Sequence, residues 1–77
     1  MTLMWEVRAT PGRFAELLAL VLAQADPSAQ VYRGAGSEGA ESDRLVLIDP
    51  TGRGVVDVPE DLLARAPHRW QFEPVRR

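Results

Sequence analysis

The chain has 77 residues, a formal net charge of −2 and no cysteine. This length suits one domain over residues 1–77, close to the size at which folding hides only ~60% of the surface of the unfolded chain. The charge argues against nucleic acid or an anionic membrane as the main partner, because both need clustered positive charge. The lack of cysteine excludes disulfides and thiolate ligands.

The amino-acid usage is typical of a globular domain, with 45% hydrophobic and 26% charged residues. All basic residues are arginine, and lysine and asparagine are absent, a bias that indicates a GC-rich bacterial genome. The N-terminus lacks the basic segment and apolar run of a signal peptide. The longest apolar stretch is far below the ~20 residues of a membrane span. We therefore expect a soluble, cytoplasmic protein.

Residues 2–9 alternate between two kinds of side chain, as expected for a half-buried strand. Leu3, Trp5, Val7 and Ala9 point one way, and Thr2, Met4, Glu6 and Arg8 point the other. A helix should follow, with Thr10 as its cap, Pro11 at its first position and Asp26-Pro27 at its end. Its apolar stripe has a 3.6-residue period and comprises Phe14, Leu17, Leu18, Val21, Leu22 and Ala25.

The middle of the chain predicts two strands separated by a polar loop. Residues 29–34 read as a short strand, and residues 34–43 as a mobile loop without apolar anchors. Residues 44–49 predict a stronger strand, in which the aliphatic residues 45–48 face both sides. A strand of this kind is usually buried on both faces.

The last third of the chain predicts a turn at 50–54, a brief strand at 55–58 and a helix of about two turns at 59–66. Residues 68–75 alternate again and predict the final strand, with Pro74 ending its pairing or marking an edge.

The resulting order is β, long α, β, β, short α, β, which favours an α+β, ferredoxin-like sandwich with helices on one face of an antiparallel sheet. The first and last strands are neighbours in that topology. The two-residue spacing of Trp70 and Phe72 then predicts that they lie beside Trp5 under the long helix. The predicted core residues are Trp5, Phe14, Leu17, Leu18, Val21, Trp70 and Phe72.

The opposite face of this sheet should carry a charged row: Glu6, Arg8, Arg69, Gln71 and Glu73. Cross-strand pairs of opposite charge contribute only ~0.2 to 1 kcal/mol each, so a solvated face explains the row without any function. If another layer covers this face, the candidates for lining a chamber are Glu6, Arg8, Arg69 and Gln71.

His68 is the only histidine and could act as a general base near neutral pH. A packing role is favoured, because the two-residue spacing of His68, Trp70 and Phe72 puts all three on one side of the predicted strand. In addition, no serine or cysteine is spaced to act as a nucleophile. Packing is also favoured over ligand stacking for the aromatic residues. The "TGRG" sequence at 51–54 could form a small anion nest but reads better as a plain turn.

We expect no metal, because one histidine and no cysteine leave only carboxylates, and these lack the spacing of a calcium loop. We also expect no cofactor. A homodimer is expected, because the outer side of the aliphatic strand at 45–48 needs cover that a lone copy cannot supply. Two sheets that face each other would provide it and enclose a partly polar chamber.

Element order, size and this sheet pairing resemble the dimeric α+β barrel superfamily, which includes the antibiotic biosynthesis monooxygenase type. The stretches "WEVRA" near the start and "HRWQFEP" near the end support the likeness. The resemblance implies a chamber that binds aromatic or polyketide-like substrates, haem or no known ligand. The chain departs from the enzymes in being short, in its small second helix and in having no asparagine.

Two functions remain open. The first is a noncatalytic accessory protein that binds a small molecule or a protein partner. The second, implied by the resemblance, is a cofactor-independent monooxygenase in which Arg8 stabilises an enolate and Glu6 or His68 acts as the base. Enclosure of Glu6, Arg8 and Arg69 in one cavity would favour the monooxygenase.

Overall fold

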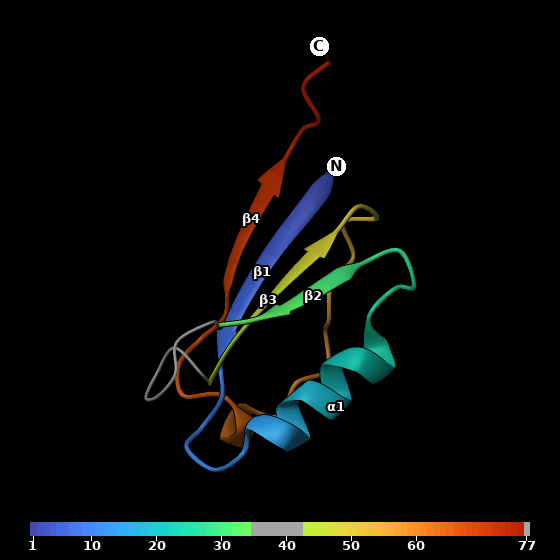
Figure 1. Cartoon of the computed structure of the whole chain (residues 1–77). Coiled ribbons are helices and arrows are strands. Elements are labelled where there is room, and N and C mark those ends of the chain that lie inside the picture. The colour runs from blue at the N-terminus through green and yellow to red at the C-terminus, as the bar shows by residue number, and fades with distance from the viewer. Residues whose placement is uncertain (35–42, 77) are drawn as a thin grey trace.

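The computed structural model describes residues 1–34 and 43–76 and has an α+β architecture, with one antiparallel sheet and one α-helix. The strands are β1 (Thr2–Arg8), β2 (Gln30–Arg33), β3 (Arg44–Asp49) and β4 (His68–Phe72), and the helix is α1 (Phe14–Gln24). Their order across the sheet is β2-β3-β1-β4, and all neighbours are antiparallel. The predicted α+β class is confirmed. Figure 1 shows α1 on one side of the sheet.

The core lies between α1 and one face of the sheet. Alternate residues of β1 and β3 point into it, as the two-residue period of a strand requires. The buried apolar residues are Leu3, Trp5, Val7, Ala9, Leu17, Val21, Leu45, Leu47, Val55 and Leu62. Phe14 and Leu18 are half-buried and pack against this cluster, whereas Leu22 is 58% exposed.

The helix begins three residues later than the sequence predicted. Gly12 has φ +81°, a left-handed conformation that cannot continue a helix, so the chain turns at residues 10–12 before α1 starts at Phe14. Thr10 does not cap α1; its hydroxyl donates to the carbonyl of Asp61 at 2.7 Å. At the other end, α1 finishes at Gln24 and Ala25 is extended, in agreement with the predicted stop before Asp26 and Pro27.

The connection between β3 and β4 differs most from prediction. Residues 55–58 form no strand, and the expected two-turn helix at 59–66 is only a three-residue 3-10 segment, η2 (Glu60–Leu62). The side chain of Gln24 satisfies the backbone of Asp57, donating to its carbonyl at 3.0 Å and accepting from its N–H at 3.4 Å. A longer helix is prevented because Ala64 donates its N–H to Arg8 and Leu63 bridges to Ala9.

The predicted loop at 34–43 falls almost entirely outside the described residues. The predicted strands at 29–34 and 44–49 correspond to β2 and β3.

β4 has the opposite facing from the one predicted. Its register with β1 pairs Trp70 with Met4 and Phe72 with Thr2, on the side away from α1. Trp70 and Phe72 are therefore not core residues, and they are 44% and 50% exposed. The alternation shows two rows but not which row points inward. With no second helix above β4 in the described residues, neither row is covered, and all five positions of the strand are exposed.

Candidate functional site: the open face of the sheet

The side of the sheet opposite α1 carries a set of side chains that we call the open face. They are Met4, Glu6 and Arg8 of β1, Gln30 and Tyr32 of β2, Arg44, Val46 and Ile48 of β3, and His68, Trp70 and Phe72 of β4. In residues 1–34 and 43–76 no helix lies over this face. Two rows cross the sheet: Tyr32-Val46-Glu6-His68 and Gln30-Ile48-Met4-Trp70.

The apolar members of the open face are Met4, Tyr32, Val46, Ile48, Trp70 and Phe72. Tyr32 is 49% exposed, and Trp70 and Phe72 are exposed to a similar extent. Met4, Val46 and Ile48 lie between them and are half-buried. Isolated apolar residues on a surface are ordinary, but a continuous apolar area on one face usually marks an interaction site.

One end of the open face holds an ionic cluster around Glu6, whose side chain is 13% exposed. Arg65 Nη2 donates to Glu6 Oε1 at 2.6 Å, and His68 Nδ1 lies 3.2 Å from the same oxygen. Arg44 Nε lies 3.3 Å from Glu6 Oε2. Both carboxylate oxygens are therefore engaged within the chain, which ties β1, β3 and the start of β4 together.

His68 connects this cluster to the apolar part of the face. Its ring meets the ring of Trp70 edge to face, with centroids 5.5 Å apart and planes at 72°. This arrangement is favourable for aromatic pairs. His68 therefore contacts both an ion pair and an aromatic side chain.

The chamber-lining candidates do not share one surface. Glu6 and Arg8 lie on the open face, whereas Arg69 and Gln71 point to the α1 side, beside Trp5 and Leu3 in the register. They are separated because β4 faces the other way. Sequence reasoning missed Arg44 and Arg65 as neighbours of Glu6. The alternation of residues 44–48 could have placed Arg44 on the face of Val46, but no sequence signal points to Arg65.

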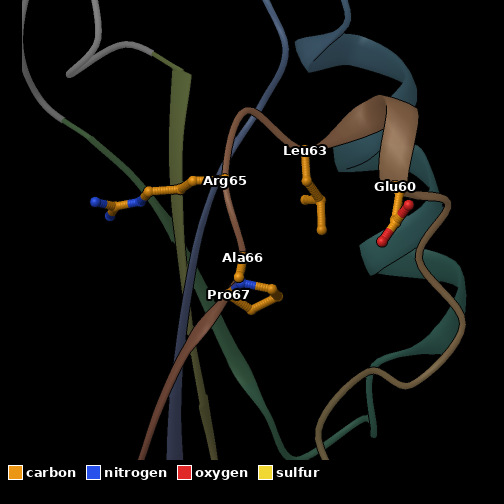
Figure 2. Close-up of a pocket in the computed structure, with 5 residues that line it drawn as sticks. All are labelled: Glu60, Leu63, Arg65, Ala66 and Pro67. Carbon is orange, nitrogen blue, oxygen red and sulfur yellow. The ribbon is translucent and has the colours of Figure 1, made fainter.

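A second feature is a groove on the α1 side, between η2 and β4. One hollow of about 350 Å³ is lined by Glu60, Leu63, Arg65, Ala66 and Pro67. A second hollow of about 350 Å³ shares Glu60, Leu63 and Pro67 and continues along Trp5, Val58 and Arg69. We call the two together the η2 groove. Figure 2 shows Leu63 and Pro67 facing the hollow, whereas the Arg65 side chain points away.

The "TGRG" turn does hold an anionic group, but that group is the chain's own Asp49. The Asp49 side chain is fully buried and accepts hydrogen bonds from the N–H and hydroxyl of Thr51 at 2.8 and 2.7 Å, and from the N–H of Gly54 at 2.8 Å. Burial alone would raise the pKa of Asp49, but these hydrogen bonds outweigh it and hold the pKa below its usual value. The turn is structural.

The described part of the chain contains no group of three or more histidine, aspartate or glutamate side chains that could hold a metal ion. None of its helices is long and apolar enough to cross a membrane. No protein-family model, curated protein or solved structure matches this chain.

Proposed function

We propose that the chain is a noncatalytic binding domain that works as a homodimer, and that the open face is the contact surface between the two copies. The observation that carries this proposal is the continuous apolar set of Tyr32, Val46, Ile48, Met4, Trp70 and Phe72 on the uncovered side of the sheet. We assign the chain to the ferredoxin-like type, with its second helix reduced to η2, and to the dimeric α+β barrel mode of assembly.

The energetics favour a second copy of modest affinity as the occupant. Tyr32, Trp70 and Phe72 each keep about half of their surface exposed. An aromatic side chain can bury ~200 Å², so two facing copies would remove roughly 600 Å² of aromatic surface from water. At ~25 cal/mol per Å² the gross gain is about 15 kcal/mol, which is comparable with the ~4 to 15 kcal/mol that association costs.

The charged end of the open face is compatible with such an interface. A buried carboxylate is strongly unfavourable unless it is paired and hydrogen-bonded. Glu6 is already paired with Arg65 and Arg44 within its own chain. Two open faces can therefore close without leaving the Glu6 charge unpaired, and a partly polar pocket would remain at that end for a small ligand.

The cofactor-independent monooxygenase is not favoured by a specific observation. A general base must lie within hydrogen-bond reach of the proton that it removes. The Glu6 oxygens already contact Arg65, Arg44 and His68, and Arg69 lies on the opposite side of the sheet from Arg8. The accessory, ligand-binding role therefore remains the proposal.

Measurement of mass by sedimentation velocity over a wide concentration range tests the dimer. The wild-type chain should exceed its monomer mass of 8.5 kDa as concentration rises. Ile48→Glu in the centre of the open face should lower the average mass at every concentration, and Tyr32→Arg, at a more exposed position, should do the same. Leu22→Glu is the matched control, because Leu22 is an exposed apolar residue on α1.

Circular dichroism must show that each variant is folded. A wild-type chain that stays at 8.5 kDa throughout would contradict the proposal. So would folded open-face variants whose mass curves coincide with that of Leu22→Glu.

A further inference from the structure

The outer edge of the sheet at β4 is open to solvent. β4 is the last strand in the order β2-β3-β1-β4, and all five of its residues are exposed. Among the described residues no strand pairs with its outer side, so a row of backbone N–H and C=O groups is available for pairing. Pro67 and Pro74 bound the strand, and because proline cannot donate to a ladder, pairing is limited to the residues between them.

Arg69 and Glu73 lie along this edge. Neither side chain forms an ion pair or hydrogen bond with another of the described residues, and both residues are exposed. Arg69 points to the α1 side, because it pairs with Trp5 in the register. Glu73 has the same parity along an extended chain, so opposite charges lie on one side of the edge, four residues apart.

We propose that two copies of the chain join their β4 strands antiparallel about a twofold axis at Gln71, and that Arg69 of each copy pairs with the partner's Glu73. This contact is an isologous one, in which the same patch of both copies is used. Its backbone contacts lie along the edge of the sheet, and of the open face only the β4 side chains take part, so it neither requires nor excludes the face-to-face contact.

Symmetry and charge select this register. Directly opposite residues must point to the same side of the joined sheet, so the axis must pass through a residue rather than between two. An axis at Arg69 would set like charges against each other, which is unfavourable. An axis at Trp70 would place Arg69 opposite the partner's Gln71 and would leave Glu73 opposite the partner's Pro67.

The axis at Gln71 forms favourable side-chain pairs on both sides of the joined sheet, which the axes at Arg69 and Trp70 do not. Arg69 faces the partner's Glu73 on the α1 side, and Trp70 faces the partner's Phe72 on the open side. Each pair occurs twice by symmetry, and both opposite-charge and aromatic cross-strand pairs are stabilising. The exposed aromatic residues of β4 would thus contact each other without any change in the fold of the single copy.

The same register accounts for the C-terminal tail and for the η2 groove. Val75 is 85% exposed, and Figure 1 shows the tail extending past the end of the sheet. Beyond the paired residues, continuation of the same register along the tail would bring Val75 near the partner's Pro67, and Pro67 lines both hollows of the η2 groove. An apolar side chain would then fill a groove that already has apolar walls, as Leu63 and Pro67 in Figure 2 illustrate.

Charge reversal tests this pairing in a background that removes the face-to-face contact. Sedimentation velocity is measured on Ile48→Glu, alone and combined with Arg69→Glu, with Glu73→Arg, or with both reversals. Each single reversal replaces two attractive pairs by two repulsive ones and should weaken self-association about tenfold or more. The double reversal restores opposite charges and should recover most of the affinity.

Arg76→Glu is the matched control, because it changes the net charge as Arg69→Glu does but has no assigned partner. Tyr32→Arg replaces Ile48→Glu as the background if the latter does not fold. Single reversals without effect, or a double reversal no better than the singles, would overturn the β4 pairing. If Ile48→Glu lowers the average mass and charge reversal does not lower it further, the open-face dimer alone is supported. If Ile48→Glu leaves the average mass unchanged and charge reversal lowers it, only the edge contact is supported.

Discussion

The two tryptophans lie in neighbouring strands of one sheet, yet their surroundings differ. Trp5 points to the α1 side and is 1% exposed, whereas Trp70 points to the open face and is 44% exposed. The difference arises from what lies above each strand, not from the residue type. Leu17 and Val21 of α1 complete the cluster around Trp5, and no helix in the described residues does the same for Trp70.

The comparison shows that the described residues cover one face of the sheet with α1 and leave the other face uncovered. The α1 side is a closed core, in which apolar residues are shielded within a single chain. The open face has apolar residues of the same kinds, but they keep much of their surface in water. Substitutions on the α1 side should therefore change folding, whereas substitutions on the open face should change association.

The largest expected effect is that of Trp5→Ala, which should lower the free energy of unfolding by about 3 to 5 kcal/mol because it empties the centre of the core. Trp70→Ala should cost about 1 kcal/mol or less in dilute solution, where the open face is not in contact with a partner. Urea denaturation measures both values. If Trp5→Ala does not fold, Trp5→Phe should still be clearly less stable than the wild type. Equal losses in the free energy of unfolding for Trp5→Ala and Trp70→Ala would contradict the difference between the two faces.

The next largest effect is expected at Gly54, which has φ +70° and lies against the α1 side of the sheet. A Cβ atom at Gly54 would lie 2.5 Å from Leu3 Cδ2, so Gly54→Ala should cost about 2 to 4 kcal/mol through strain and overpacking. Gly12→Ala is the control, because Gly12 has φ +81° but no atom within 4 Å of the added carbon. It should cost only about 1 kcal/mol. Thermal unfolding that ranks Gly12→Ala as the more harmful change would refute this assignment.

Asp49, the last residue of β3, is charged and fully buried, so its substitution measures what its hydrogen bonds contribute to stability. Asp49→Asn should lower stability by about 1.5 to 3 kcal/mol near neutral pH, because it removes the charge that accepts hydrogen bonds from Thr51 and Gly54. The folded-state pKa of Asp49 is lowered. The Asp49 charge therefore contributes fully to the free energy of unfolding above about pH 4, which is the pKa of aspartate in an unfolded chain. This contribution decreases as the pH falls through the folded-state pKa.

The difference between wild type and Asp49→Asn should thus shrink in acid, as denaturation at a series of pH values would show. Asp57→Asn, at an exposed position, is the control. A difference that grows as the pH falls would contradict the proposed role of the Asp49 charge.

The smallest effect is expected on the outer surface of α1. Arg13 Nε donates to Glu16 at 2.6 Å, and this hydrogen bond lowers the pKa of Glu16. Both side chains are in contact with solvent, where such pairs contribute little. Glu16→Gln should leave the urea midpoint almost unchanged, while the carboxyl resonance of Glu16 in the wild type should titrate below its usual range by NMR. A large loss of stability in Glu16→Gln would contradict this expectation and would show that solvent-exposed ion pairs contribute substantially to folding.

Sequence reasoning located α1 and the strands β1, β2, β3 and β4, because their hydrophobic periods are local properties. It also oriented β1 correctly, since only one of its two rows is apolar. It failed for β4, where the apolar row of Trp70 and Phe72 was expected to point inward. Their facing is decided by the register of β4 with β1, which pairs Trp70 with Met4 and Phe72 with Thr2, residues far apart in the sequence.

The candidate site was predictable only in part for the same reason. Glu6 and Arg8 could be placed on the face opposite the core from the alternation of β1. The neighbours of Glu6 could not, because Arg65 is 59 residues away in sequence and lies in no regular element.

The sequence by itself determined the class of fold, the apolar row of β1 and the stripe of α1, because residue type and spacing fix which side of a helix or strand is apolar. Only the tertiary structure decided that residues 59–66 form no more than the short segment η2, that β4 presents its aromatic residues to the open face, and that Arg69 and Glu6 lie on opposite sides. These features depend on strand register and on whether the backbone groups of Leu63 and Ala64 bond within a helix or to residues 8 and 9. Both are settled by contacts between residues far apart in the chain.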